Sequence, residues 1–294
     1  MNQALKAKPT PTPLITLISD ICRKILANRA SLPSMPDVAA RIHSAMASPN
    51  WSIGTIATII KGDPGTTTYM LQIANSAMYP SINPIREVDL AVARIGMDNT
   101  RSLVMGHALR SMFVTRSQIL GALMRRTWQT SARLAAYASV LARHCSSISP
   151  ERALLGGLLQ DIGSLPILNV LKEYQDQLTN EAQILGAIER YSPQVGMVLL
   201  KQWGFEADLV EVARSRGDWL RDPDPSPDLA DLVLLARLHD KIVQGESDGL
   251  PRMDEVPAFA KFSVGELNED SSLEILNAEQ SAVTDVMRVL GVSQ

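Results

Sequence analysis

Cysteine and aromatic residues are both scarce in this 294-residue chain, and their scarcity narrows the classes of protein it can be. The two cysteines, Cys22 and Cys145, lie far apart and have no ligand-like neighbours. They support neither a disulfide framework nor a zinc module, which is typical of a reduced cytosolic protein. Aromatic residues make up only 4% of the chain. Ala, Leu, Ile, Val and Met must therefore fill the core, a composition that favours helices.

The chain also lacks an excess of charge of one sign. Its net charge is -3, so nothing global indicates binding to nucleic acid or to an anionic membrane. Residues 1–9 contain no apolar signal core. No run approaches the roughly 18 apolar residues needed to cross a bilayer. The sequence predicts a soluble, cytoplasmic protein.

A third absence is that of strands: no alternation of apolar and polar residues persists, and no repeat recurs. Helical spacing of apolar residues instead recurs from Leu14 to Leu290. We predict an all-α chain with a flexible leader at 1–13, an N-terminal helical part at 14–115 and a second helical part with a helical tail at 116–294. Within the second part, 181–189 and 193–203 are predicted as separate helices.

The stretch 154–163 contains a helix that is apolar nearly all round, so we expect it to be buried, yet this helix ends in a polar pair, Gln160 and Asp161. Its helix begins at Ser149 and Pro150, an N-cap followed by a first position that needs no N–H. A buried Asp is costly unless it is hydrogen-bonded or bound to a metal. Two interpretations stay open from these residues alone: Asp161 ties down the next turn, or it belongs to a metal or phosphate site.

Other polar positions favour structural roles. Asp63 and Pro64 read as an N-cap and first helical position, and Asn75 with Ser76 can close the same helix towards the second half. A contact with a partner or ligand is the alternative for these residues. The pair 156–157 consists of two glycines inside a helix, which suits close helix packing rather than phosphate binding.

The remaining titratable residues are interpreted as solvated or structural. The pair His239–Asp240 is expected on a solvated helix face, and the other histidines are expected at the surface or satisfied in the core. Cys145 next to His144 is not expected to be a nucleophile, because helical neighbours point about 100° apart. Basic spots are expected to be solvated, with an anion contact as the alternative; they comprise Arg125, Arg126, Arg214 and Arg216.

Three N-terminal segments resemble the HDOD domain, a bacterial signalling module. They are Leu32-Pro33-Ser34-Met35-Pro36, the run from Asp63-Pro64 to Ala74-Asn75-Ser76-Ala77, and Ala91 to Ile95-Gly96. Leu158-Leu159-Gln160-Asp161-Ile162-Gly163 is similar to the family's LLHDIG segment, inherited from the HD phosphohydrolase superfamily. The resemblance spans about residues 30–240. It implies a helical N-terminal domain packed on a degenerate HD-like domain.

The resemblance also shows what this chain lacks. The superfamily holds one or two cations with several His residues, a His-Asp pair and a late Asp. Only Asp161 remains here. The other matching positions of this vestigial site are occupied by Thr130, Gln160, Ser192 and Arg237.

These side chains cannot form a tight transition-metal site, and arginine cannot lose its proton to become a ligand. We hypothesise that an arginine near Asp161 replaces the cation by a charge-assisted pair. The expected function is a non-catalytic regulatory scaffold that binds signalling proteins and is tuned by a nucleotide or other anion. We expect no catalytic residue, metal or cofactor, and a monomer or a dimer. The alternatives are a metal-dependent phosphohydrolase with substituted ligands and a nucleotide sensor.

Overall fold

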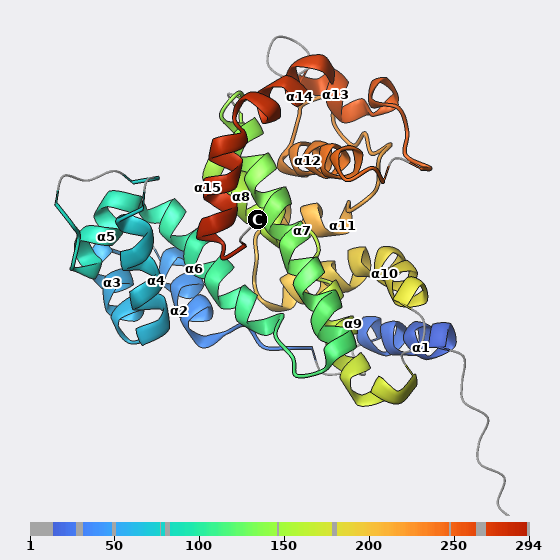
Figure 1. Cartoon of the computed structure of the whole chain (residues 1–294), viewed down its shortest axis with the longest axis horizontal. Helices are drawn as coiled ribbons and strands as arrows, with labels where there is room; N and C mark the ends of the chain where they lie inside the picture. The colour runs from blue at the N-terminus through green and yellow to red at the C-terminus, as the bar shows by residue number, and fades with distance from the viewer. Residues whose placement is uncertain are drawn as a thin grey trace, which may run out of the picture.

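The chain folds as an assembly of packed helices, shown in Figure 1 as a computed structural model. The structure describes residues 14–27, 32–48, 51–76, 78–79, 83–145, 147–177, 181–246, 248–262 and 269–292. Within these ranges the regular structure is helical and no strand occurs, so the all-α prediction is confirmed. The leader predicted at 1–13 lies outside the described residues.

A small bundle forms the N-terminal side of the molecule, on the left of Figure 1. Two of its helices begin at polar caps: Ser52 Oγ accepts from Thr55 N at 3.1 Å, and Asp63 Oδ2 accepts from Thr66 N at 2.7 Å. Pro64 stands at the first helical position, as predicted. The bundle buries an apolar cluster of its own. Its elements are α2 (Asp37–Ala47), α3 (Ile53–Lys61), α4 (Pro64–Ala74) and α5 (Val88–Ile95).

Helix α6 (Met97–Met112) joins the bundle to the rest of the molecule because its two faces lie in different cores. Leu103 and Val104 belong to the core of the bundle, whereas Met105 and Leu109 belong to a second, larger core. Helix α1 (Leu14–Leu26) packs in that larger core against α9 (Ser164–Leu171) and α10 (Glu181–Gln202), far from the bundle that follows it in sequence. The predicted division at residue 115 falls in the loop after α6 and stays a prediction.

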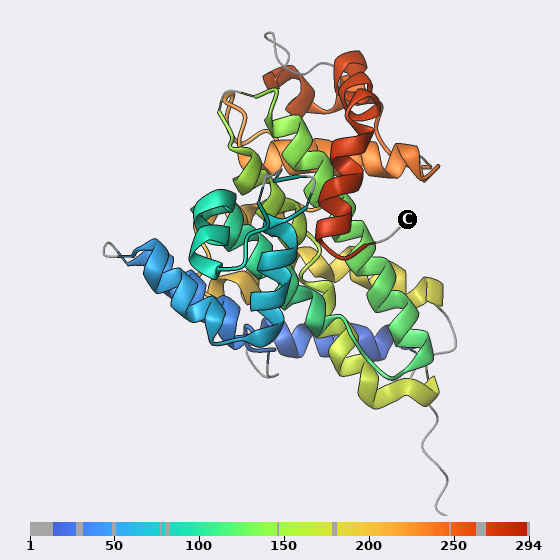
Figure 2. The same cartoon turned by 60° about the vertical axis from the view of Figure 1, so that its left-hand side comes forward.

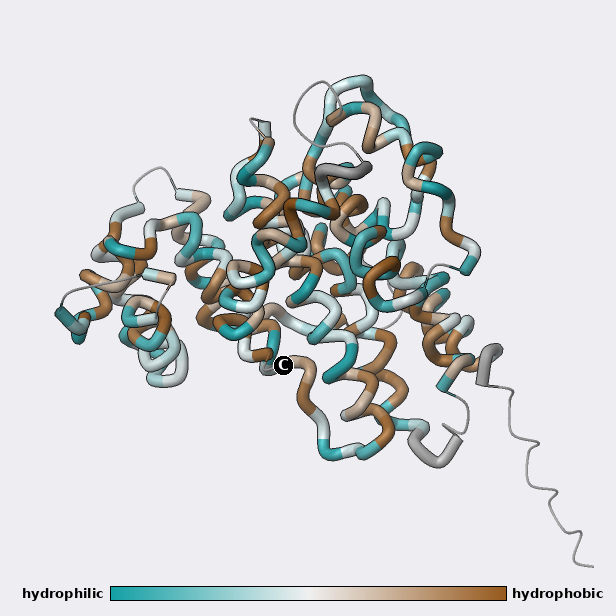
Figure 3. The backbone as a smooth tube through the Cα atoms, turned by 45° about the horizontal axis from the view of Figure 1, so that its top comes forward, coloured by the Kyte–Doolittle hydropathy of each residue, from teal (hydrophilic) through white to brown (hydrophobic). Residues whose placement is uncertain are grey.

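The larger core surrounds α7 (Gln118–Ala142), the long central helix in Figures 1 and 2. Apolar segments recur through the helices packed around it (Figure 3). They are α8 (Pro150–Leu159), α9 (Ser164–Leu171), α10 (Glu181–Gln202), α11 (Ala207–Arg214), α12 (Leu229–Val243), α13 (Pro257–Phe262), α14 (Glu269–Ala278) and α15 (Gln280–Val289), with two 3₁₀ turns at Lys172–Gln177 and Met253–Glu255.

Glycines let α8 approach its neighbours closely. A Cβ at Gly157 would collide with the backbone of α7 at Ala135. A Cβ at Gly156 would lie 3.1 Å from Val233 on α12. This geometry agrees with the helix-packing role predicted for the pair and brings the end of α8 into the centre of the core.

Three predicted features differ from the structure. The segments 181–189 and 193–203 form one helix, α10, with Pro193 inside it. The tail is broken at Glu279 into α14 and α15. The stretch Pro150–Tyr174 is long and apolar enough to cross a membrane, contrary to the expectation that no run was, but 89% of its most apolar window is buried inside the fold. Its hydrophobicity is therefore that of a core element.

Candidate functional site

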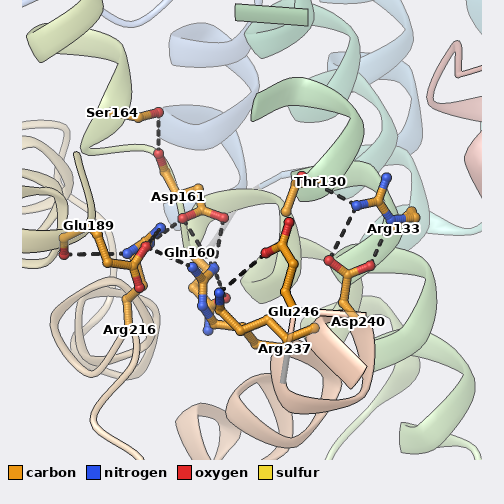
Figure 4. Close-up of polar contacts among 11 residues, drawn as sticks. Thr130, Arg133, Gln160, Asp161, Ser164, Glu189, Arg216, Arg237, Asp240 and Glu246 are labelled. Atoms are coloured by element: carbon orange, nitrogen blue, oxygen red, sulfur yellow. Dashed lines mark hydrogen bonds and ion pairs between the residues drawn. The ribbon is translucent and has the colours of Figure 1, made fainter. Parts of the chain in front are cut away.

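Asp161 lies in the turn between α8 and α9 and is buried. Its backbone carbonyl accepts hydrogen bonds from the Ser164 hydroxyl at 2.7 Å and from the Ser164 N–H at 3.0 Å. These bonds close the turn and leave the carboxylate free to face the opposite side, where α10, α11 and α12 meet it (Figure 4). The backbone, rather than the carboxylate, therefore ties down the turn.

Two buried arginines converge on the Asp161 carboxylate. Arg216, just after α11, donates from Nε to Oδ1. Arg237 on α12 donates from Nη1 to Oδ2 at 3.0 Å and approaches Oδ1 at 3.3 Å. The hypothesis that an arginine lies within reach of Asp161 thus holds for two of them, and both pairs are charge-assisted.

Glu189 on α10 completes the cluster from its solvent side. Its carboxylate lies 2.9 Å from Arg216 Nη2 and 3.5 Å from Arg237 Nη2, and its side chain is 51% exposed. Pro193 has no N–H to donate to the Glu189 carbonyl four residues earlier. Arg216 Nη1 approaches that carbonyl at 3.5 Å instead. The proline that was expected to divide the helix thus frees an acceptor for the cluster.

The cluster contains two guanidiniums and two carboxylates, so its formal charges balance. Burial alone would raise the pKa of Asp161, but the charges of Arg216 and Arg237 outweigh burial and lower it to about 2. Burial would likewise raise the pKa of Glu189, but the same two arginines bring that pKa below its ordinary value. Both carboxylates are ionised at neutral pH and are committed to the arginines.

The other residues of the predicted vestigial site are only partly brought together. Gln160 Oε1 lies 3.3 Å from Arg237 Nη1, so Gln160 extends the cluster. Ser192 is buried, and its hydroxyl has no partner among the described residues. Thr130 on α7 lies 3.4 Å from Arg133, which pairs with Asp240 at 2.7 Å rather than with Asp161 (Figure 4).

A cleft of about 510 Å³ opens above the cluster. Its lining includes Thr130, Asp161, Glu189, Arg216 and Arg237, but not Gln160 or Ser192. Other charged residues stand along it, and they are Arg126, Arg133, Asp240, Lys241 and Glu246. A cleft with five cations and four carboxylates can bind a polar ligand, and its slight excess of positive charge favours an anion.

The expectation of solvated faces is wrong at two places. Arg216 is buried, unlike Arg214. His239 and Asp240 are also buried, because α12 is covered by α7, α8, α11 and α13. Asp240 pairs with Arg133, whereas His239 stands edge-on to Phe259 and neither ring nitrogen has a partner among the described residues. Tertiary burial on all sides of one helix overrides the polar pattern of its sequence.

The residues of the HDOD motif have local structural contacts. Asn75 donates to the Leu71 and Ile85 carbonyls, each at 2.8 Å, and accepts from Ile85 N at 2.7 Å. It therefore fastens the loop before α5 to the end of α4, within the small bundle and not towards the second half. Ser76 Oγ has no partner among the described residues.

Sequence reasoning missed Glu189 and misjudged Arg216. A signal existed for both: Glu189 precedes Ser192 by one helical turn, and Arg216 falls in the segment where the superfamily often has His. A second missed feature is Gly163, at which a Cβ would collide with the backbone of α10 at Ser192 and Gly196. These two glycines let the Asp161 turn lie directly against α10.

The residues present do not fit the metal centre that the fold family implies. The Asp161 carboxylate receives two guanidiniums, and the positions around it supply a carboxamide and a hydroxyl rather than imidazoles. Among the described residues, no three His, Cys, Asp or Glu side chains gather into a group that could hold a metal ion. A cation placed next to two buried guanidiniums would also be repelled.

Comparison with solved structures finds several proteins with a similar fold. A protein of Shewanella amazonensis SB2B, provisionally named a metal-dependent phosphohydrolase, is 23% identical with a TM-score of 0.73, over 94% of this chain and 96% of that chain. An HDOD domain protein of unknown function from Geobacter sulfurreducens is 19% identical with a TM-score of 0.67, over 94% and 98%. A protein of Marinobacter aquaeolei VT8, provisionally named a signal transduction protein, is 20% identical with a TM-score of 0.65, over 94% and 66%. At these identities the likeness establishes the fold and not an activity.

The sequence comparisons agree with the structural ones. An uncharacterized protein of Treponema pallidum (strain Nichols) is 22% identical over 241 residues, which is 75% of this chain but only 45% of that relative. The chain thus spans less than half the length of the curated relative it matches. The HDOD domain model matches residues 32–218, from the segment before α2 to just past Arg216. Since this match covers more than half of the chain, the protein belongs to the HDOD domain family.

Proposed function

We propose that this chain is a non-catalytic regulatory protein that acts by binding other proteins. The observation that carries the proposal is the Arg216–Asp161–Arg237 cluster. In this cluster Asp161, the one carboxylate that matches the superfamily's metal ligands, is held in internal ion pairs. A carboxylate held in this way can neither bind a cation nor activate water.

Membership of the HDOD family and the resemblance to the Marinobacter signalling protein support a regulatory role. The cleft above the cluster supports a ligand-tuned version of it. Arg126 and Lys241 stand along the cleft, each paired with Glu246 at 3.3 to 3.5 Å. An anionic ligand such as a nucleotide could take the place of Glu246 on both cations and thereby change the surface that a partner meets.

Metal content and phosphodiesterase activity test the non-catalytic part. We expect the purified full chain to hold far less than one equivalent of manganese after dialysis and to show no turnover of bis(p-nitrophenyl) phosphate. Stoichiometric metal, together with turnover that is lost in Asp161→Ala, would establish the phosphohydrolase alternative. Asp161→Ala can also lose turnover by unfolding the chain. Arg126→Ala, at the edge of the cleft, is therefore a second variant, in which a loss of turnover would not arise from a broken cluster.

Calorimetry and reconstitution test the binding part. Cyclic dinucleotides and guanosine tetraphosphate are titrated into the full chain, and heat that disappears in Lys241→Ala is expected if the cleft holds an anion. No heat with any of these nucleotides would count against the ligand-tuned version.

Reconstitution tests protein binding. Proteins captured by this chain from the native cell are purified, and at least one of them should bind the pure chain again. If none of the captured proteins binds in this step, the result counts against the scaffold.

A further inference from the structure

One segment of the chain carries positive charge without any acid of its own. Between Asp98 and Glu151, residues 99–150 contain seven arginines and no Asp or Glu. Four of these arginines reach carboxylates in other parts of the chain, and they are Arg101, Arg126, Arg133 and Arg143. The other three, Arg110, Arg116 and Arg125, have no carboxylate partner among the described residues. Within the described part of the chain, three cations around the loop that joins α6 to α7 are thus left without a carboxylate.

Two of these unpaired arginines flank a pocket of about 240 Å³. Arg110 comes from the last turn of α6, and Arg125 comes from the second turn of α7. Buried Phe113 and Trp128 line the pocket, with ring centroids 6.0 Å apart. The rest of the lining adds Val114, Gln129, Gly291 and Val292, and no acid is among the residues that line it.

The walls of this pocket are built features of the fold. The Trp128 indole N–H donates to the Leu290 carbonyl at 3.2 Å, which holds the end of α15 against α7. Gly291 has φ +73°, and a Cβ there would collide with the Arg110 guanidinium. The guanidinium therefore lies against the backbone that follows α15. Val114, at the rim, is 69% exposed, an unusual position for a large apolar side chain next to an apolar pocket.

Size and charge together indicate the kind of occupant. A pocket of about 240 Å³ is smaller than the roughly 300–1,000 Å³ typical of small-molecule sites, and it suits a single anchoring side chain. Arg110 and Arg125, which have no carboxylate partner in the described ranges, can attract carboxylates at the edge of the pocket, and an arginine keeps its charge at every physiological pH. An apolar anchor flanked by acids matches both properties.

We propose that this pocket docks an acidic segment of a partner protein, with an apolar or aromatic side chain inside it and neighbouring carboxylates on Arg110 and Arg125. The inference rests on the proposed function for the existence of a protein partner. It assigns the contact to the α6–α7–α15 corner and not to the cleft above Asp161. The partner segment is an extended or helical peptide in which Asp and Glu surround one Phe, Leu or Trp.

Fluorescence anisotropy with a defined peptide tests the inference on the full chain. The probe is a fluorescein-labelled Glu-Asp-Glu-Phe-Asp-Glu peptide, compared with the same peptide carrying Ser in place of Phe. We expect binding that weakens severalfold when NaCl is raised from about 50 to about 300 mM, because screening reduces exposed charge attraction. We also expect the Ser peptide to bind about tenfold more weakly, because it lacks the anchor.

Charge-reversal variants identify the surface. The double variant Arg110→Glu with Arg125→Glu should weaken binding about tenfold or more, because both contacts become repulsive. Arg116→Glu is the matched control: it reverses an unpaired cation on the same loop that does not line the pocket, and should change binding by less than about twofold. Val114→Asp is a second test at an exposed position, where misfolding is not expected, and circular dichroism checks the fold of each variant.

In the peptide experiments, three outcomes would overturn the inference: no binding of the Phe peptide, equal binding of the Phe and Ser peptides, or equal losses in the Arg116 control and the double variant. If the chain binds no peptide but sediments with phosphatidylserine vesicles, and the double variant no longer does so, the occupant of this surface is instead an anionic lipid membrane. A native partner that binds the double variant normally overturns this pocket but leaves the regulatory proposal standing. Phosphodiesterase turnover would overturn the regulatory proposal whatever the peptide does.

Discussion

At the scale of single residues, Asp161 shows how two arginines can compensate the charge of a buried carboxylate. Removing a carboxylate and two guanidiniums from water is costly, and the cost is recovered only when every charge has a partner in good geometry. Here Glu189 and Gln160 supply further acceptors, whereas Arg237 Nε has no partner among the described residues. The cluster joins α8, α10, α11 and α12 at one point, so a change at Asp161 should be felt by the whole core.

The substitution Asp161→Asn keeps the shape of the side chain and removes its charge. We expect it to lower the free energy of unfolding by about 3–5 kcal/mol, because two buried guanidiniums lose their shared counter-charge. Urea denaturation at pH 7 measures the effect. The control is Asp208→Asn, whose side chain is 44% exposed in its pair with Arg152 and should cost no more than about 1 kcal/mol. Similar costs for the two variants would show that the cluster does not hold the core together.

Burial lowers the pKa of His239 to about 4, below its ordinary value of about 6.5. The unfolded chain therefore binds a proton more readily than the folded chain between these values. The stability associated with a neutral His239 is complete above about pH 6.5 and is lost as the pH falls towards 4, by at most about 3 kcal/mol.

His239→Leu should flatten this part of the stability profile while leaving stability near pH 7.5 unchanged or higher, because two unpaired ring nitrogens leave the core. Unfolding free energies of both chains between pH 4 and pH 7.5 measure the difference. His144→Leu, at an exposed ring paired with Glu279, is the control. This variant should keep the decrease in unfolding free energy that the wild type shows as the pH falls towards 4. Parallel profiles for wild type and His239→Leu would contradict the assignment.

At the scale of elements, glycines decide how closely the central helices meet. Gly157 lies against the α7 backbone and Gly163 against the α10 backbone, so both ends of the Asp161 turn depend on the absence of a Cβ. The helical periodicity of 150–160 predicted a buried helix correctly. It could not specify which backbone each glycine would touch, because that choice depends on the crossing of helices distant in sequence.

Gly157→Ala should be strongly destabilising, by about 2 kcal/mol or more, because the added methyl group would overlap backbone atoms that cannot rotate away. Gly186→Ala on α10 is the matched control: a methyl group there would meet no neighbouring atom within 4 Å, the site is exposed, and alanine favours helix. We expect this control to stabilise the chain by up to about 1 kcal/mol. Thermal unfolding followed by circular dichroism separates the two, and stabilisation by both would refute the packing explanation.

At the scale of the whole molecule, the segment that carries the family match does not contain the whole core. Residues 32–218 exclude α1 and α12, yet α1 packs on α9 and α10, and α12 supplies Arg237 and contacts α7, α8 and α11. Buried Leu232, Leu235 and Leu238 on α12 would leave their partners facing water in its absence.

A shortened chain of residues 32–218 should therefore fail to unfold cooperatively, since its exposed apolar faces and its Asp161 cluster would both be incomplete. Near-ultraviolet circular dichroism and a thermal melt of this chain, beside those of residues 14–292, measure the outcome. A sharp transition at the midpoint of the longer chain would show that α1 and α12 are dispensable.

The sequence alone determined the helical class, the beginnings of the helices at Pro64 and Pro150, and the family resemblance, because these depend on local periodicity, capping residues and the chemistry of individual side chains. Only the tertiary structure decided that Arg216 and Arg237 meet at Asp161 and that Glu189 joins them. It also decided that His239 and Asp240 are buried, although their sequence neighbourhood is polar. The reason is physical: burial on all sides of α12 and the convergence of four helices arise from contacts between residues far apart in the chain, which no local pattern encodes.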